Sequence, residues 1–201
     1  SAASDVYKRQ QLPRVADVVQ DTLELMNLKP NEEVEPFVCD FKDAFHILKL
    51  HQDERKYFVL FHRGKYLVCM TTTQGSRGAP LTWARTAALL GRLLQATLGT
   101  DMARVSTYVD DPVVVAIGDK STRDRTVAIC ICLWCALGFP LSLHKAGRNL
   151  RQTWTSAIFS TVAGPSHSDP SVTVDIKENL VVETTELLEK HLRSNVFPIK
   201  E

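Results

Sequence analysis

The chain has 201 residues, 44% of them hydrophobic and 23% charged, and a formal net charge of +1. This length can bury one substantial core and is short for two full domains. No apolar run approaches the roughly 20 residues that a membrane span needs, and no signal peptide is apparent. We therefore expect a cytoplasmic or nuclear protein without a membrane partner, not a secreted one.

Cysteine usage also argues against secretion. The count of five is odd, and Cys130, Cys132 and Cys135 share a segment with a helical pattern, unlike a disulfide framework. Zinc would need a second pair of ligands beside Cys132 and Cys135. We therefore predict reduced thiols, buried on a helix face.

Charge is distributed unevenly along the chain. Residues 41–104 carry ten Lys/Arg against four Asp/Glu, a local charge of +6, whereas residues 11–40 carry two against seven, a local charge of −5. A phosphate-binding surface needs local positive charge, because screening limits electrostatic reach to about 8 to 10 Å. The basic segment is equally compatible with an ordinary solvated face.

The first half of the chain predicts a helix, a strand and a hairpin. Residues 1–10 lack apolar periodicity, and we treat them as an artefact or disordered. Residues 12–26 have helical apolar spacing, residues 37–39 form a short apolar strand that ends at Asp40, and residues 57–61 and 66–70 flank a turn at Arg63-Gly64.

The second half predicts longer elements. Pro80 and Gly99 bound a helix over residues 80–98, and residues 105–109 and 113–117 form a hairpin around Asp110-Asp111-Pro112. A capping box of Ser121 and Asp124 opens a helix that Gly138 ends. Strands are predicted at residues 141–143, 153–161 and 172–174, and a last helix at residues 177–194. This order predicts an α+β fold, an antiparallel sheet backed by helices, close to the split βαβ pattern.

Three carboxylates are the main chemical feature. Asp40, Asp110 and Asp111 stand at the ends of apolar strands, where a buried charge is costly without a partner. If they converge, they repel one another unless a hard cation such as Mg²⁺ lies between them. The alternative is that Asp110-Asp111-Pro112 only supplies turn chemistry.

Four segments resemble the palm motifs of reverse transcriptases, in that family's order. They are VCDFKDAF (residues 38–45), TQGSRGAP (73–80), YVDD (108–111) and LGFPLSLHK (137–145). The resemblance covers residues 12–162 and weakly the tail, and it is nearest to tyrosine-recombinase (DIRS-like) retrotransposons. It implies a reverse-transcriptase palm with a ferredoxin-like sheet over residues 37–164, partial fingers at 11–36, an inserted fingers hairpin at 56–70, and the start of a thumb or connection region at 165–201.

The resemblance also implies an activity, RNA-directed DNA polymerisation at a primer 3′-hydroxyl. Its partners would be an RNA or DNA template with primer and deoxynucleoside triphosphates. Asp40, Asp110 and Asp111 would hold two Mg²⁺ ions, with Mn²⁺ as a possible substitute, and Lys145 would protonate the leaving pyrophosphate.

The same resemblance implies a substrate site. Phe45 would lie under the incoming sugar and exclude a 2′-hydroxyl, unless it is a core aromatic. Arg77 and Lys145 are alternatively solvated side chains, and Asp43 a helix cap. The full set expected to bind substrate is Asp43, Ala44, Phe45, Gln74, Gly75, Arg77, Tyr108 and Val109.

Two features depart from the family's pattern. Pro112 stands where an aliphatic residue is usual, and it removes a backbone donor beside Asp111. Only 39 residues precede Asp40, which is short for complete fingers. A catalytically decayed palm remnant that at most binds nucleic acid is therefore the main alternative. An RNA-templated RNA polymerase is disfavoured by Phe45 and by Tyr108-Val109. Residues 154–157 resemble the primer-grip hairpin.

Overall fold

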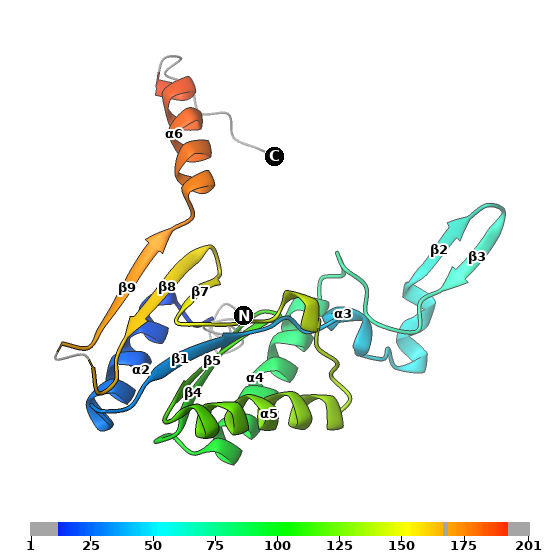
Figure 1. The fold of residues 1–201 in the computed structure, drawn as a ribbon. Coiled ribbons are helices and arrows are strands. Elements are labelled where there is room, and N and C mark those ends of the chain that lie inside the picture. The colour runs from blue at the N-terminus through cyan, green and yellow to red at the C-terminus, as the bar shows by residue number, and fades with distance from the viewer. Residues whose placement is uncertain (1–11, 167–168, 193–201) are drawn as a thin grey trace, which may run out of the picture.

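A four-stranded antiparallel sheet forms the centre of the molecule (Figure 1). The computed structural model describes residues 12–166 and 169–192, so the expectation for residues 1–10 lies outside the described chain. The strands are β1 (Val34–Val38), β4 (Ala103–Tyr108), β5 (Asp111–Ile117) and β6 (Gly147–Arg148), in the order β4-β5-β1-β6. This mixed α+β arrangement is the predicted palm-like fold.

Both faces of β5 are buried. Val113, Val115 and Ile117 belong to one apolar cluster and Val114 to the other, because successive side chains of a strand point to opposite faces. The strand therefore appears in the sequence as a continuous apolar run rather than an alternating one.

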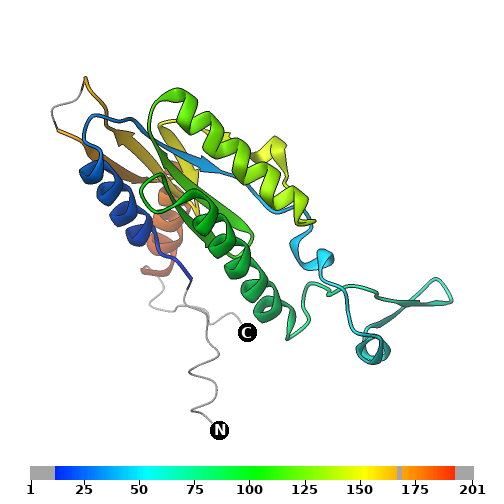
Figure 2. The same cartoon turned by 90° about the horizontal axis from the view of Figure 1, so that it is seen from below.

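Each cluster is closed by different elements. Helices α4 (Ala79–Leu98) and α5 (Lys120–Ala136) cover the Val114 face. Helix α2 (Val15–Leu28) covers the other face together with a second sheet of β7 (Arg151–Trp154), β8 (Ala157–Val162) and β9 (Ser171–Ile176). Figure 2 shows α2 on one side and α4 and α5 together on the other, in agreement with the two clusters.

Short elements connect these layers. Helix α3 (Ala44–Ile47) follows β1, η1 (Gln52–Tyr57) leads to the hairpin of β2 (Val59–His62) and β3 (Lys65–Val68), and η2 (Leu143–Lys145) precedes β6. All eight residues of β2 and β3 are exposed. The hairpin and α6 (Glu178–Leu192) extend away from the central sheet (Figure 1). Within the described ranges, no helix has the length and apolar composition to cross a membrane.

Several sequence predictions need correction. Residues 141–143 are not a strand: Leu141 forms an isolated bridge with Phe41, and a 3-10 turn follows. Residues 153–161 are a hairpin, not one strand. Helix α5 is capped by Asp119, not Ser121. Of the three helical cysteines, only Cys130 is buried, although all are free thiols as predicted.

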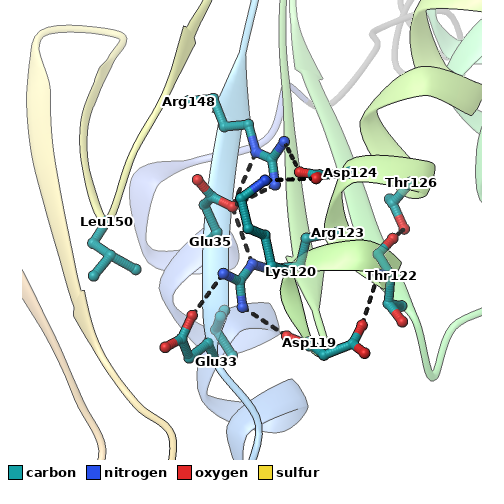
Figure 3. A network of polar contacts seen from close by, with 12 residues as sticks. Glu33, Glu35, Asp119, Lys120, Thr122, Arg123, Asp124, Thr126, Arg148 and Leu150 are labelled. Atoms are coloured by element: carbon teal, nitrogen blue, oxygen red, sulfur yellow. Dashed lines mark hydrogen bonds and ion pairs between the residues drawn. The ribbon is translucent and has the colours of Figure 1, made fainter.

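An ionic network ties β1 to α5 and β6 (Figure 3). The buried Arg123 guanidinium lies 2.6 Å from Glu33 and 3.1 Å from Glu35, and it donates to the Gly118 carbonyl at 2.7 Å. Arg148 bonds Glu35 at 2.9 Å and Asp124 at 2.5 Å. Shared carboxylates and several donors make such a network stronger than isolated surface pairs. It fixes the end of the sheet opposite the carboxylate turn.

Candidate active site

Asp40 lies two residues after the end of β1 and is held by its backbone. Its carbonyl accepts the Ser142 amide at 2.8 Å, and the Lys42 amide donates to Pro140 at 2.9 Å. These bonds bring the segment before η2 alongside the end of β1. The Lys145 ammonium consequently lies 2.9 Å from the Asp40 carboxylate, so two predicted catalytic residues from distant segments are in direct contact.

The other two carboxylates lie at the β4–β5 turn. Tyr108 pairs with Asp111, which leaves Val109 and Asp110 at the two central positions. Val109 has a φ of 55°, a left-handed conformation that costs a β-branched residue about 1 to 3 kcal/mol. The Phe41 amide donates to the Asp110 carbonyl at 2.9 Å. This bond joins the turn to the strand end that carries Asp40.

A cavity of about 320 Å³ lies on one side of these carboxylates. Seven of its lining residues are predicted catalytic or substrate-binding residues: Asp40, Asp43, Ala44, Phe45, Gln74, Asp110 and Lys145. Helix α3 and the loop of residues 71–78 form its wall, and the Thr72 hydroxyl ties the two by donating to the Phe45 carbonyl. The structure therefore gathers most of the predicted site around one polar hollow.

A second cavity, of about 450 Å³, lies on the other side. It shares Asp40, Asp110 and Lys145 with the first and adds Asp111. Its remaining wall contains the β7–β8 turn, whose Thr155 and Ser156 both have positive φ. The two cavities therefore adjoin at Asp40, Asp110 and Lys145, which line both of them.

Lys177 also lines the second cavity and was not predicted. It follows β9, and β9 reaches the site only because Ile176 pairs with Ala157. No local sequence signal marks a lysine whose neighbours are set by long-range strand pairing.

The electrostatics of the carboxylates reflect partial burial. Burial raises the pKa of Asp110, and the nearby Asp40 carboxylate raises it further. The pKa of Asp111 is raised by burial and by the charges of Asp110 and Asp40. The hydrogen bond to Asp40 raises the pKa of Lys145. The site therefore has negative charge that a cation would stabilise.

The side chains present are of the type that binds magnesium, but they are not arranged as a complete metal site. Carboxylate oxygens are the ligands that Mg²⁺ prefers. Asp40, however, is engaged by Lys145, and no three His, Cys, Asp or Glu side chains of residues 12–166 and 169–192 are grouped closely enough to hold an ion. Metal binding would require the Asp40 carboxylate to turn toward the hairpin.

The remaining predicted residues lie around these cavities rather than in their walls. Arg77 and Gly75 are exposed on the loop next to Gln74, and Gly75 has a φ of 85°. Tyr108 packs edge-on against Trp154, with ring centroids 6.3 Å apart. Val109 packs against the α4/α5 cluster. These four are near the site without lining it.

Phe45 and Asp43 each had a structural alternative. Phe45 lines the smaller cavity and also packs against Trp83, with ring centroids 6.4 Å apart, so its ring contributes to both the cavity wall and the core. Asp43 makes no side-chain cap, which excludes the capping alternative. Its backbone has a φ of 53°, and its carbonyl accepts the His46 amide at 2.7 Å.

Two solved structures with a similar fold are those of a foamy viral protease-reverse transcriptase. The structure of the foamy viral protease-reverse transcriptase dRH in complex with double-stranded DNA matches with a TM-score of 0.62 and 14% identity, over 88% of this chain and 26% of that one. The foamy viral protease-reverse transcriptase in complex with an RNA/DNA hybrid matches with a TM-score of 0.56 and 15% identity, over 75% and 18%. No protein-family model and no curated protein matches the sequence. The fold is thus reverse-transcriptase-like, and the chain spans about a quarter or less of these neighbours.

Proposed function

We propose that this chain is the palm region of an RNA-directed DNA polymerase from a retroelement, nearest to DIRS-like retrotransposons by its motifs. The observation that carries the proposal is the shared position of Asp40, Asp110 and Lys145 between two polar cavities. One cavity suits an incoming deoxynucleoside triphosphate and the other a primer terminus. The neighbours' RNA/DNA and DNA complexes support nucleic acid as the partner.

Each residue has a part in nucleotidyl transfer. Asp40, Asp110 and Asp111 would hold two magnesium ions, which when bound supply charge neutralisation and an activated hydroxyl. The Lys145 ammonium, kept protonated by its acidic neighbours, would donate a proton to the departing pyrophosphate. The Phe45 ring, at the cavity wall, would exclude a 2′-hydroxyl. Gln74 and the backbone near Asp43 would contact the triphosphate.

Primer extension tests the proposal. With oligo(dT) on poly(rA) and Mg²⁺, we expect the chain to add dTMP and Asp110→Asn to lose about a hundredfold or more of the rate, the scale for removing one electrostatic stabiliser. Asp53→Asn is the matched control, because that carboxylate is exposed on η1. Phe45→Ala should admit ribonucleotides in the same assay. Equal rates for wild type and Asp110→Asn would rule out this metal site.

One observation favours the second candidate, a palm remnant that binds nucleic acid without catalysis. The Asp40–Lys145 ion pair occupies a carboxylate that catalysis requires for metal. Retention of primer-template by a wild-type protein that adds no nucleotide would select this candidate.

A further inference from the structure

The carbonyls of four successive residues, Val109 to Pro112, each accept a hydrogen bond from outside the hairpin. Two of the four donors are backbone amides at the end of β1: Phe41 donates to Asp110 at 2.9 Å and Cys39 to Pro112 at 3.2 Å. These bonds continue the pairing of β1 with β5. The carbonyls between and before them, of Asp111 and Val109, point to other donors.

Those two donors are indole groups. Trp83 Nε1 donates to the Val109 carbonyl at 2.8 Å, and Trp154 Nε1 donates to the Asp111 carbonyl at 2.9 Å. The two accepting residues stand on either side of Asp110. The indoles are 0% and 3% exposed, so neither N–H can exchange its partner for bulk water without local opening.

The indoles reach the turn from opposite sides of the sheet. Trp83 comes from α4 and belongs to the α4/α5 cluster, where it packs edge-on against Phe41 at 5.5 Å. Trp154 comes from β7 and belongs to the α2 cluster, where it packs against Phe159. Each of the two apolar clusters thus contributes one tryptophan that donates a hydrogen bond to the segment Val109 to Pro112.

The turn needs such support because its backbone is strained. Val109 has a positive φ where hairpins of this kind usually have glycine. A strained conformation persists only where its surroundings over-determine it.

We propose that Trp83 and Trp154 are positioning residues that clamp the Val109-Asp110 turn and so fix the direction of the Asp110 and Asp111 carboxylates. The proposal deepens the proposed polymerase function and rests on it for its catalytic consequence. Neither tryptophan touches substrate or metal through its indole N–H in this role; each acts through the turn backbone.

Trp134 provides a matched control. It is 0% exposed, belongs to the same cluster as Trp83, and also packs edge-on against Phe41, with ring centroids 5.2 Å apart. Its Nε1 has no hydrogen-bond partner within the described residues. Trp134→Phe therefore removes a similar volume of buried ring without removing a bond to the turn.

Amide hydrogen exchange measured by NMR tests the clamp without requiring activity. The Phe41 amide reports turn opening because it bonds Asp110. We expect Trp83→Phe and Trp154→Phe each to accelerate its exchange about tenfold, the effect of losing one hydrogen bond, relative to the amide of Val115 in mid-β5. Trp134→Phe should leave that ratio unchanged. Replacing Trp83 with 3-benzothienyl-alanine keeps the ring shape and removes only the N–H. We expect it to accelerate exchange as Trp83→Phe does, and no acceleration would show that ring packing, not the hydrogen bond, is responsible.

Primer extension then tests the catalytic consequence. Trp83→Phe and Trp154→Phe should lower kcat about tenfold, the effect of one lost hydrogen bond. KM for dTTP should change little, because the residues proposed to contact the nucleotide (Phe45, Gln74 and Asp43) belong to the other wall of the cavity. Unchanged exchange at Phe41, equal acceleration by Trp134→Phe, or an unchanged kcat in an active protein would overturn the inference. If the variants show the expected exchange pattern but the wild-type protein extends no primer, the clamp is supported and the polymerase proposal is contradicted.

Discussion

Pro112 lies in β5 immediately after the two aspartates, opposite Thr107. It is fully buried, and its carbonyl accepts the Cys39 amide. A residue with an N–H at this position would return a second bond to Cys39, as antiparallel pairs do. Proline gives up only that one bond, just beyond the end of β1, and the Phe41–Asp110 bond is kept, so the hairpin is not disrupted.

Asp110→Asn should stabilise the fold at neutral pH. Burial raises the carboxyl pKa above its ordinary 3.8, so the ionised form is disfavoured in the folded state. This cost is fully present above the folded pKa and disappears as pH falls below 3.8. We expect the free energy of unfolding at pH 7 to rise, because asparagine removes a charge that burial disfavours in the folded state.

Urea unfolding at pH 7 and pH 3 measures this effect. The gain of Asp110→Asn over wild type should vanish at pH 3, where both side chains are neutral. A gain that persists at pH 3, or a loss at pH 7, would show that the carboxylate is not destabilising. The exposed Asp53→Asn should show no gain at either pH.

The start of α5 shows how a single cap sets an element. The Asp119 side chain accepts the Thr122 amide at 2.7 Å, a bond that lowers the pKa of Asp119. Asp124, the expected partner of Ser121, instead pairs with Lys120 and Arg148. Glycine at 118, with a φ of 133°, lets the chain turn from β5 directly into this cap.

Asp119→Ala should therefore lower the melting temperature, and Ser121→Ala should not. Because the folded pKa of Asp119 is depressed, its contribution is present above pH 3.8 and is lost as pH falls through the folded pKa. Thermal unfolding at pH 7 and pH 2.5 checks both points. A larger drop in melting temperature for Ser121→Ala than for Asp119→Ala would show that Ser121 caps the helix, as the sequence predicted.

The sequence predicted correctly those elements whose ends are set by residues within or next to them. Helix α4 has Pro80 in its first turn and Gly99 after its last residue, and the structure begins and ends it within one residue of the prediction. The strand predicted at residues 141–143 is absent although Leu141 and Leu143 alternate like a strand. Pairing stops after the single bridge of Leu141 with Phe41, because the 3-10 turn Leu143–Lys145 follows at once. The Ser142 amide, which belongs to that bridge, bonds Asp40. No local pattern contains that partner, 102 residues away (142 − 40).

At the scale of the whole molecule, motif order predicted which residues lie close together, whereas their further neighbours depend on pairing between distant segments. Asp40, Asp110 and Lys145 were expected together from their family resemblance, and they share both cavities. The ion pair that engages Asp40 and the place of Lys177 were not foreseeable, since both depend on how separate layers pack. The same holds for the two indoles, which residue type alone marks as core.

The ionic network at the other end of the sheet carries the largest expected stability change. Arg123 is buried between β1 and α5, and its removal leaves Glu35, 14% exposed at its side chain, with Arg148 alone. Removing one partner of a buried ion pair lowers the free energy of unfolding by about 3 to 5 kcal/mol. Because Glu35 keeps its bond to Arg148, we expect a loss near the lower end of this range for Arg123→Met. The free energy of unfolding in urea measures this loss.

Arg125→Met is the control, because Arg125 is exposed on the same helix two residues later, and exposed substitutions change stability by only about 0.5 kcal/mol. Combining Arg123→Met with Glu35→Leu should recover part of the loss, since it removes the uncompensated charge together with its partner. Equal losses for Arg123→Met and Arg125→Met would show that the network contributes nothing beyond helix propensity. The expected difference would mean that the ionic network fixes this end of the sheet.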